Sequence, residues 1–270
     1  FPTRRSSDLI EATDTTFTEN ESGVLITQSL TISDIDDTHI DSAAVWISGN
    51  YQSDEDSLFW QEVAKSKNGY TPQWNLANGK LIFDNDFSLA ELQGYLRNTY
   101  YVNTSDNPDT TKRTVSIQVF DGDSLSNILT RDIEIIAVND APEISDLPAS
   151  ALQFTERDSA LLVCPNITLF DVDSDDLDSV IVTIEHYESG FDTLLYSVPL
   201  KQSKSLTSKA MAGVWNEQAG TLTFSAVTSV QTYQSILRIL EFFNSSKMPD
   251  ETTRTVHIRI VDDSLDVDQG

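Results

Sequence analysis

Cysteine is almost absent from this chain, because Cys164 is the only one among 270 residues. One cysteine allows no intramolecular disulfide, so the fold must be held by its hydrophobic core and by any metal that it binds. Long apolar runs are also missing, since none approaches the ~18 residues that a membrane-spanning helix needs, and no signal-peptide pattern opens the chain. We therefore predict no direct insertion of these residues into a membrane.

Basic residues are scarce as well: 17 Lys and Arg stand against 43 Asp and Glu, for a formal net charge of −26. This excess repels nucleic acids and anionic membranes, and it makes the surface a good host for hard cations. The three histidines, His39, His186 and His257, lie in unrelated places. No nucleophile has a visible base and no carboxylate pair occupies a recognisable cleft, so we predict that the protein is not an enzyme.

What the sequence does contain is a repeat of itself. Thr18-Glu19 recurs as Thr155-Glu156 and Asp34-Ile35-Asp36 as Asp171-Val172-Asp173, at an offset of 137 residues (19 to 156). Trp74-Asn75 recurs as Trp215-Asn216 and Arg113-Thr114-Val115 as Arg254-Thr255-Val256, at an offset of 141 residues (113 to 254). A period this long indicates whole domains in tandem rather than a solenoid of small units.

The repeat sets the predicted domain boundaries. The strand-like stretch before Ala137 runs into Asn139-Asp140-Ala141-Pro142, whose proline favours a break. We predict one domain over residues 14–138 and a second over 139–270, truncated at its C-terminal end, with further repeats following. Residues 1–13 are expected to be a foreign or linker segment outside the fold.

Short strands dominate each copy. Val115, Ile117 and Val119 alternate with polar residues, which is the period of a half-buried strand. Asn78-Gly79 predicts a hairpin because both residues accept positive φ, and Ser88 followed by Glu91 predicts a capped helix over residues 88–97, with its counterpart over 229–238. About seven strands per copy predict an all-β fold of two tandem β-sandwiches, each with one short helix.

The acidic residues gather in turns at the predicted strand ends, as in Asp34-Ile35-Asp36, Asp121-Gly122-Asp123 and Asp171-Val172-Asp173. Calcium takes six to eight oxygen ligands, which such turns can supply. Aspartate and asparagine also favour turns for a simpler reason, because their side chains bond the nearby backbone. The repetition of the whole set favours the metal interpretation.

At these residues the chain resembles the cadherin-like repeats of large surface proteins and adhesins, over residues 14–270. The resemblance implies an Ig-like Greek-key sandwich and calcium sites between neighbouring domains. Glu19, in Glu19-Asn20-x-x-Gly23, resembles the family's Glu at the base of the first strand. Asp106 or Asp109 resembles the family's acids in the loop before the sixth strand. The remaining implied ligands are Asn139 and Asp140 in the linker, Asp171 and Asp173 in the next domain, and Asp262 near its end. Ala137 and Ala141 stand where the family has an acid and an Asn.

By the same resemblance, Asp34, Asp36 and Asp121 form half of a calcium site at the other end of the first repeat. Glu156 is the corresponding half for a domain after the second.

The resemblance implies a function as a calcium-rigidified repeat of an extracellular or cell-surface adhesion protein. The implied partners are neighbouring repeats of the same chain and a cell-surface protein or glycan that the sequence does not name. A carbohydrate-binding, lectin-like module is the alternative, based on the sandwich fold and on Trp46, Trp60, Trp74 and Trp215. The repeated position of Trp74 and Trp215 beside a hairpin favours packing for those two, which leaves Trp46 and Trp60 as the sugar-stacking candidates. Coplanar, exposed indole rings beside a groove would favour that alternative.

Overall fold

The computed structural model describes residues 10–62, 69–196, 212–262 and 267–269. The chain divides between Val138 and Asn139 into two compact units, each described here by itself. Within the described residues, neither helix has the length and apolar character needed to cross a bilayer.

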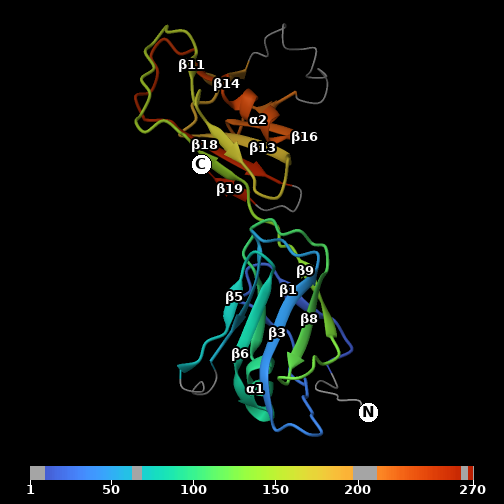
Figure 1. The fold of residues 1–270 in the computed structure, drawn as a ribbon. Helices are drawn as coiled ribbons and strands as arrows, with labels where there is room; N and C mark the ends of the chain where they lie inside the picture. The colour runs from blue at the N-terminus through green and yellow to red at the C-terminus, as the bar shows by residue number, and fades with distance from the viewer. Residues whose placement is uncertain (1–9, 63–68, 197–211, 263–266, 270) are drawn as a thin grey trace. The chain divides into compact units, whose positions relative to one another are not determined.

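Nine strands and one helix are described in the first unit (Figure 1). They are β1 (Thr15–Thr18), β2 (Val24–Leu25), β3 (His39–Gly49), β4 (Asp56–Trp60), β5 (Gln73–Asn75), β6 (Lys80–Ser88), α1 (Leu89–Arg97), β7 (Thr99–Asn103), β8 (Arg113–Phe120) and β9 (Leu129–Ile136). A six-stranded sheet has the order β1-β9-β8-β3-β6-β5, and a three-stranded sheet has the order β2-β7-β4. Only the β1–β9 pair among these neighbours is parallel.

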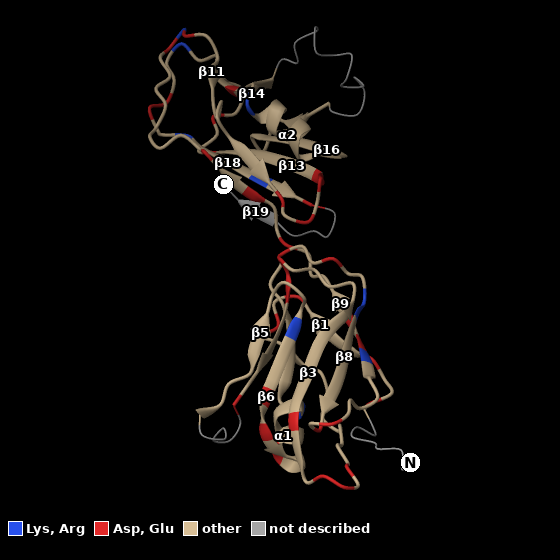
Figure 2. Ribbon diagram, in the orientation of Figure 1, with Lys and Arg blue, Asp and Glu red and all other residues tan. Residues whose placement is uncertain are grey.

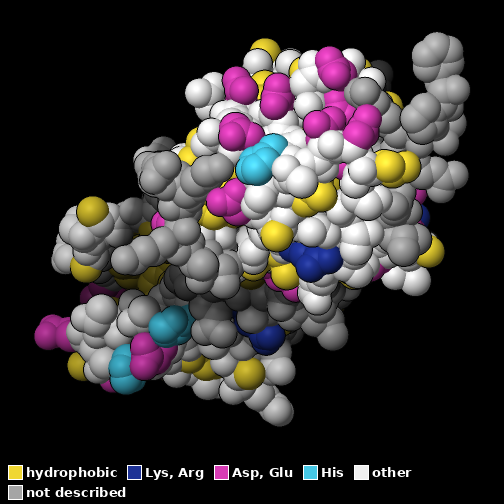
Figure 3. Space-filling view, turned by 60° about the horizontal axis from the view of Figure 1, so that its bottom comes forward, with side chains coloured by type: hydrophobic (Ala, Val, Ile, Leu, Met, Phe, Trp, Pro, Cys, Tyr) yellow, Lys and Arg dark blue, Asp and Glu magenta, His cyan; other side chains and the backbone are white. Residues whose placement is uncertain are grey.

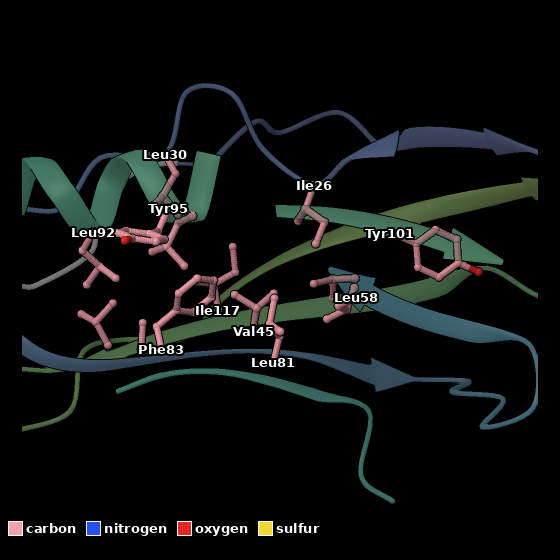
Figure 4. Packing of buried hydrophobic residues seen from close by; sticks show 14 of the residues in the cluster. Ile26, Leu30, Val45, Leu58, Leu81, Phe83, Leu92, Tyr95, Tyr101 and Ile117 are labelled. Atoms are coloured by element: carbon pink, nitrogen blue, oxygen red, sulfur yellow. The ribbon is translucent and has the colours of Figure 1, made fainter. Parts of the chain in front are cut away.

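Both sheets of the first unit face one hydrophobic core. Val45, Leu81 and Ile117 reach it from the larger sheet, and Leu58 and Tyr101 from the smaller one (Figure 4). Alternate residues of each strand point inward, as the period of two requires. Two sheets packed face to face around one core are the arrangement expected of a two-layered all-β fold.

The second unit contains ten described strands and one helix. They are β10 (Glu143–Ser145), β11 (Leu161–Leu162), β12 (Thr168–Phe170), β13 (Asp176–Glu185), β14 (Asp192–Tyr196), β15 (Val214–Asn216), β16 (Thr221–Ser229), α2 (Val230–Leu237), β17 (Leu240–Asn244), β18 (Thr255–Val261) and β19 (Val267–Gln269). The order β15-β16-β13-β18 matches β5-β6-β3-β8 of the first unit, and β11-β17-β14 matches β2-β7-β4. The short β19 pairs with β18 on the side that β9 takes on β8. The predicted all-β class and the short helix in each unit are therefore confirmed, while the cadherin-like topology stays a prediction.

The two helices begin at the predicted caps. The Ser88 hydroxyl accepts from the amide of Glu91 at 3.3 Å, and the Glu91 carboxylate accepts from the amide of Ser88 at 2.8 Å, which completes a capping box. In α2, Ser229 caps the amide of Thr232 at 3.3 Å without a reciprocal carboxylate.

The predicted hairpin joins β5 to β6, but its turn differs from the predicted one. Gly79 has φ of 60°, whereas Asn78 is not among the residues with positive φ. The turn therefore needs glycine at one position only. A Cβ at Gly79 would lie 3.0 Å from the Tyr51 ring, which packs edge-on against Trp74 at 6.3 Å. This packing accounts for the repeated tryptophan.

Part of the segment that we expected to lie outside the fold contacts the first unit. Ile10 packs against its core. Glu11 accepts hydrogen bonds from the Thr27 hydroxyl at 2.7 Å and from the amides of Gln28 and Ser29 at 2.7 and 2.8 Å. The expectation was wrong for these two residues, because a carboxylate that caps a distant turn cannot be recognised from local composition. Residues 1–9 lie outside the described part of the chain.

Candidate metal centre

The Asp-x-Asp motifs form the same local turn in both units. Asp171 accepts at one oxygen, Oδ1, from the amides of Asp173 and Ser174 at 3.2 and 3.0 Å. Asp34 does the same with the amides of Asp36 and Asp37 at 3.1 and 3.0 Å. Hydrogen bonding to the local backbone therefore explains the Oδ1 atoms of Asp34 and Asp171. It does not explain their Oδ2 atoms.

Asp171 and Asp173, which follow β12, meet two other segments of the second unit. The amide of Asp140, before β10, donates to Asp173 Oδ2 at 3.2 Å. The Asn139 side-chain amide donates to Asp262 Oδ2 at 2.6 Å, and Asp262, directly after β18, is fully buried. These five residues, Asn139, Asp140, Asp171, Asp173 and Asp262, are called the Asp171 cluster below.

Two carboxylate oxygens of this cluster are buried without a hydrogen bond. Asp171 Oδ2 and Asp173 Oδ1 have no partner among the described residues. Leaving a buried acceptor unpaired costs about 1–3 kcal/mol, and more when it is charged. Burial, followed by the interaction with the Asp173 side chain, raises the pKa of Asp171 to about 6. The cluster thus crowds negative charge and oxygen ligands in a way that a bound cation would relieve.

The donor set fits calcium. It consists of carboxylate and amide oxygens, with neither histidine nor cysteine among the five residues. Hard oxygen ligands in an irregular arrangement suit Ca²⁺, whereas zinc and copper favour nitrogen and sulfur.

In the first unit, Glu19 lies at the end of β1 and is only 4% exposed. Its Oε2 accepts from the amide of Val138 at 2.8 Å, and its own amide donates to the Ile136 carbonyl at 2.8 Å. Asn20 and Gly23 have φ of 68° and 134°, so both occupy conformations that favour these residue types. The motif thus holds Glu19 beside the last residues of its unit.

The other predicted half-site of the first unit is partly assembled. Oxygens of Asp34, Asp36 and Asp37 all lie within 4.8 Å of one another, and Asp34 Oδ2 is buried without a partner among the described residues. Burial raises the pKa of Asp34, but hydrogen bonds from the amides of Asp37 and Asp36 outweigh that effect and lower it. Asp121 lies in its own turn after β8 and accepts from the amides of Asp123 and Ser124 at 2.8 and 2.7 Å.

Sequence reasoning missed two acids at this end of the first unit. Asp37 belongs to the group just described. Asp41 lies against the Asp121 turn, because a Cβ at Gly122 would meet Asp41 Oδ2 at 2.9 Å. The sequence pointed to them only weakly, because neither Asp37 nor Asp41 belongs to the Asp-x-Asp pair that recurs in the second unit.

The structure gives the acids before β8 different surroundings. Asp106 is exposed in the loop after β7. Asp109 accepts from the amide of Thr111 at 2.7 Å and from the Gln52 side chain at 3.2 Å. Asp109 also lies 3.9 Å from the guanidinium of Arg113. Asp109 therefore stabilises its own loop.

A buried network beside Asp109 was not predicted. Asp56 accepts from Arg113 at 2.8 Å, from the Tyr101 hydroxyl at 2.6 Å and from the Asn103 side chain at 3.1 Å. In the second unit Asp192 accepts from Arg254 at 2.9 Å and from Asn244 at 2.6 Å. The recurrence of Arg113 as Arg254 was the feature of the sequence that could have indicated this network.

Comparison with known proteins gives one sequence relative and several distant structural likenesses. No family model matches the chain. A stretch of 102 residues, 37% of the chain, is 33% identical to Halomucin of Haloquadratum walsbyi, and the match spans 1% of that protein's length. The similarity therefore concerns a small part of a very large protein.

Two solved structures illustrate the structural likenesses. Extracellular cadherin domains 3–6 of Protocadherin Gamma B2 align with 97% of this chain and 45% of their own, at 9% identity and a TM-score of 0.31. The C-terminal domain of the Streptococcus pyogenes antigen I/II-family protein AspA aligns with 82% of this chain and 80% of its own, at 11% identity and a TM-score of 0.23. TM-scores this low establish neither a shared fold nor a shared function.

The tryptophans of the lectin alternative do not form one platform. Trp46 belongs to β3 of the six-stranded sheet and Trp60 to β4 of the three-stranded sheet. Lys80 lies 4.8 Å from the Trp46 ring centre, and Trp60 packs on Tyr95 at 4.8 Å. Neither arrangement favours sugar stacking, which needs a coplanar exposed pair.

Proposed function

We propose that this chain is a calcium-binding, tandem-repeat part of an extracellular or cell-surface adhesion protein. The observation that carries the proposal is the Asp171 cluster, where two buried carboxylate oxygens accept no hydrogen bond from the described part of the chain and lie beside three further oxygen-bearing side chains. The similarity of part of the chain to Halomucin supports placement in a large surface protein.

In this proposal the Asp171 cluster supplies the calcium ligands of the second unit. Asp171 Oδ2 and Asp173 Oδ1, the two oxygens without a hydrogen bond to the described residues, would bind the ion. Asn139, Asp140 and Asp262 would supply the remaining oxygen ligands. The ion would neutralise carboxylates that otherwise repel one another in a partly buried place. Glu19 is the ligand that the first unit would add, and this part of the proposal rests on the sequence resemblance alone.

The proposed role of calcium is mechanical. Asn139 and Asp140 lie directly after the boundary between the two units. An ion that ties them to Asp173 and Asp262 would therefore order the start of the second unit. At ten times its dissociation constant, one ion stabilises the bound arrangement by roughly 1.4 kcal/mol. Neighbouring repeats of the same chain are the proposed partners, together with a surface protein or glycan bound by the complete molecule.

Calorimetry with Ca²⁺ and Mg²⁺ tests the assignment of the metal. We expect Ca²⁺ to bind with a dissociation constant on the order of 10⁻⁴ to 10⁻³ M, the range of extracellular modules. Mg²⁺ should bind more weakly, because it demands a tighter octahedral shell than irregular loops supply. Equal affinities for the two ions would count against the proposal.

A further inference from the structure

The second unit has a groove of about 630 Å³ beside β18. One wall is the extended segment Pro148–Phe154, and the other is Thr252–Val256 at the start of β18 (Figure 1). Val163 and Phe242 also line it. No described strand pairs with Thr255–Ile258 on the side away from β13. The groove therefore lies along an open strand edge.

The corresponding place in the first unit is filled by β9. That strand pairs in parallel with β1, with Thr15 opposite Ile133. On its other side it pairs antiparallel with β8, with Ile117 opposite Leu129. At the repeat offsets, β1 corresponds to Leu152–Thr155 and the start of β8 to Arg254–Ile258. Both walls of the groove are thus the counterparts of strands that hold β9.

Aromatic packing shows that the wall segment occupies the place of β1. Phe154 packs on Phe242 with ring centres 5.5 Å apart and planes at 86°. Their counterparts Phe17 and Tyr101 pack at 5.4 Å and 89°. The ring pair is therefore in place in the second unit, although Leu152–Thr155 has no strand partner among the described residues.

Side chains that are fully buried beside β9 in the first unit are more exposed in the second. Phe17, Ile26 and Val115 are 0% exposed. Their counterparts Phe154, Val163 and Val256 are only partly buried. Exposed apolar surface of this kind favours occupation by an apolar partner.

The short strand β19 sets the direction of that partner. It pairs antiparallel with β18, with Arg259 opposite Gln269 and Val261 opposite Val267. Subtracting the repeat offset of 141 residues turns Gln269 into Ile128, the residue before β9. The pairing of β19 with β18 then has the same register as the pairing of β9 with β8, in which Ile117 lies opposite Leu129. β19 is therefore the counterpart of the three residues before β9, and a strand continuing from it would run along the open edge.

Glu156 has a different partner from its counterpart Glu19. Its Oε1 lies 3.1 Å from Nε of the neighbouring Arg157. Glu19 instead accepts from the amide of Val138, two residues after the end of β9.

We infer that this groove is an acceptor site for one extended strand of the β9 type. The strand continues the line of β19, antiparallel to β18 and parallel to Leu152–Thr155. Its apolar side chains fall at the positions of Ile133 and Ile135, which are buried in the first unit. The position of Arg131 suits a basic residue, because Arg131 donates to the Ile26 carbonyl at 2.6 Å and Val163 is the counterpart of Ile26. The inference does not depend on calcium.

The test is to extend the full chain after Gly270 with the sequence of Thr130–Val138, which falls in register with β19. Hydrogen exchange is then measured by mass spectrometry. We expect amide exchange in Thr255–Ile258 and Leu152–Thr155 to slow by about tenfold or more, since an open edge exchanges readily and a paired strand does not. Unchanged protection in β13 shows that the unit remains folded.

The matched control carries the same residues with each neighbouring pair exchanged along the extension. This exchange keeps the composition but moves the apolar side chains to the opposite face of the strand. Protection by the register extension and not by the control supports the acceptor site. Equal protection by both extensions, or protection by neither, overturns it.

Discussion

The two oxygens of a single aspartate have different tasks in this chain. Asp171 Oδ1 closes a turn by accepting from two amides, and Asp171 Oδ2 is buried without a partner among the described residues. A turn alone explains the first oxygen. The second is costly to the fold unless a cation binds it.

The first residue-scale prediction concerns the double variant Asp171→Asn and Asp173→Asn. We expect it to lose at least tenfold in Ca²⁺ affinity measured by calorimetry, because two anionic ligands become neutral. The far-UV circular dichroism should be unchanged, since the side chains lie outside the core.

The matched control is Asp175→Asn with Asp176→Asn, which removes the same charge from two exposed positions, the last residue before β13 and its first residue. Its Ca²⁺ affinity should stay within about threefold of the original, as expected for screened surface charges. Equal losses in both double variants would show that net charge, rather than ligation, attracts the ion.

Glu11 makes the stability of the first unit dependent on pH. Burial raises its pKa, but hydrogen bonds from Thr27, Gln28 and Ser29 outweigh this and lower the pKa from 4.5 to about 2. Because the folded pKa is depressed, the stabilisation is present above pH 4.5 and is lost as the pH falls toward 2. We expect Glu11→Gln to cost about 1–2 kcal/mol at pH 7.

Urea denaturation at pH 7 and pH 2.5 checks the Glu11 prediction. The difference between the original chain and Glu11→Gln should shrink at the lower pH. A difference that stays constant would mean that Glu11 is not responsible for this part of the acid sensitivity.

At the scale of elements, one buried ion pair joins β4 and β8 while Tyr101 and Asn103 attach β7 to it. Asp56 and Arg113 are 2% and 0% exposed, so neither charge is solvated. Breaking a buried pair by removing one partner leaves the other charge uncompensated, at a cost of about 3–5 kcal/mol. The network therefore connects the two sheets of the first unit through polar groups as well as through the core.

We expect Asp56→Asn to destabilise the first unit by about 3 kcal/mol. Hydrogen exchange should show faster opening of β3 and unchanged protection of β13. The matched variant Asp192→Asn should do the reverse, because Asp192 holds the same place in the second unit. Equal effects of either variant on both units would mean that the two units unfold together.

At the scale of the whole molecule, charge is the dominant feature. Segments coloured for Asp and Glu are more frequent than those for Lys and Arg on the ribbon of Figure 2, and acidic side chains outnumber basic ones on the face drawn in Figure 3. This agrees with the net charge of −26. Exposed like charges repel within the ~8 Å screening length of physiological salt. Calcium at the Asp171 cluster would remove part of that repulsion next to the boundary between the units.

The whole-molecule prediction is that calcium narrows the distribution of distances between the two units. Small-angle scattering with calcium and then with a chelator measures this distribution, and the Asp171→Asn, Asp173→Asn double variant should not respond to the ion. If the distance distributions with and without calcium coincide, calcium does not stiffen the chain, and the chain is a passive spacer.

Much of the local structure could be predicted because it depends on residues close together in the sequence. The capped helix at Ser88, the hairpin at Gly79 and the Asp-x-Asp turns each form within a few residues. The repeat also allowed each pattern to be read twice, which favoured the metal interpretation at Asp171.

Only the tertiary structure decided how distant residues meet. Asp56 and Arg113 are 57 positions apart, and Asn139 and Asp262 are 123 apart. The sequence could pair the last two only through a resemblance, and it missed the first pair. It also could not show that Asp171 Oδ2 is buried or that the edge of β18 is open. Burial and edge exposure depend on which strands pack together, and this is a property of the complete fold.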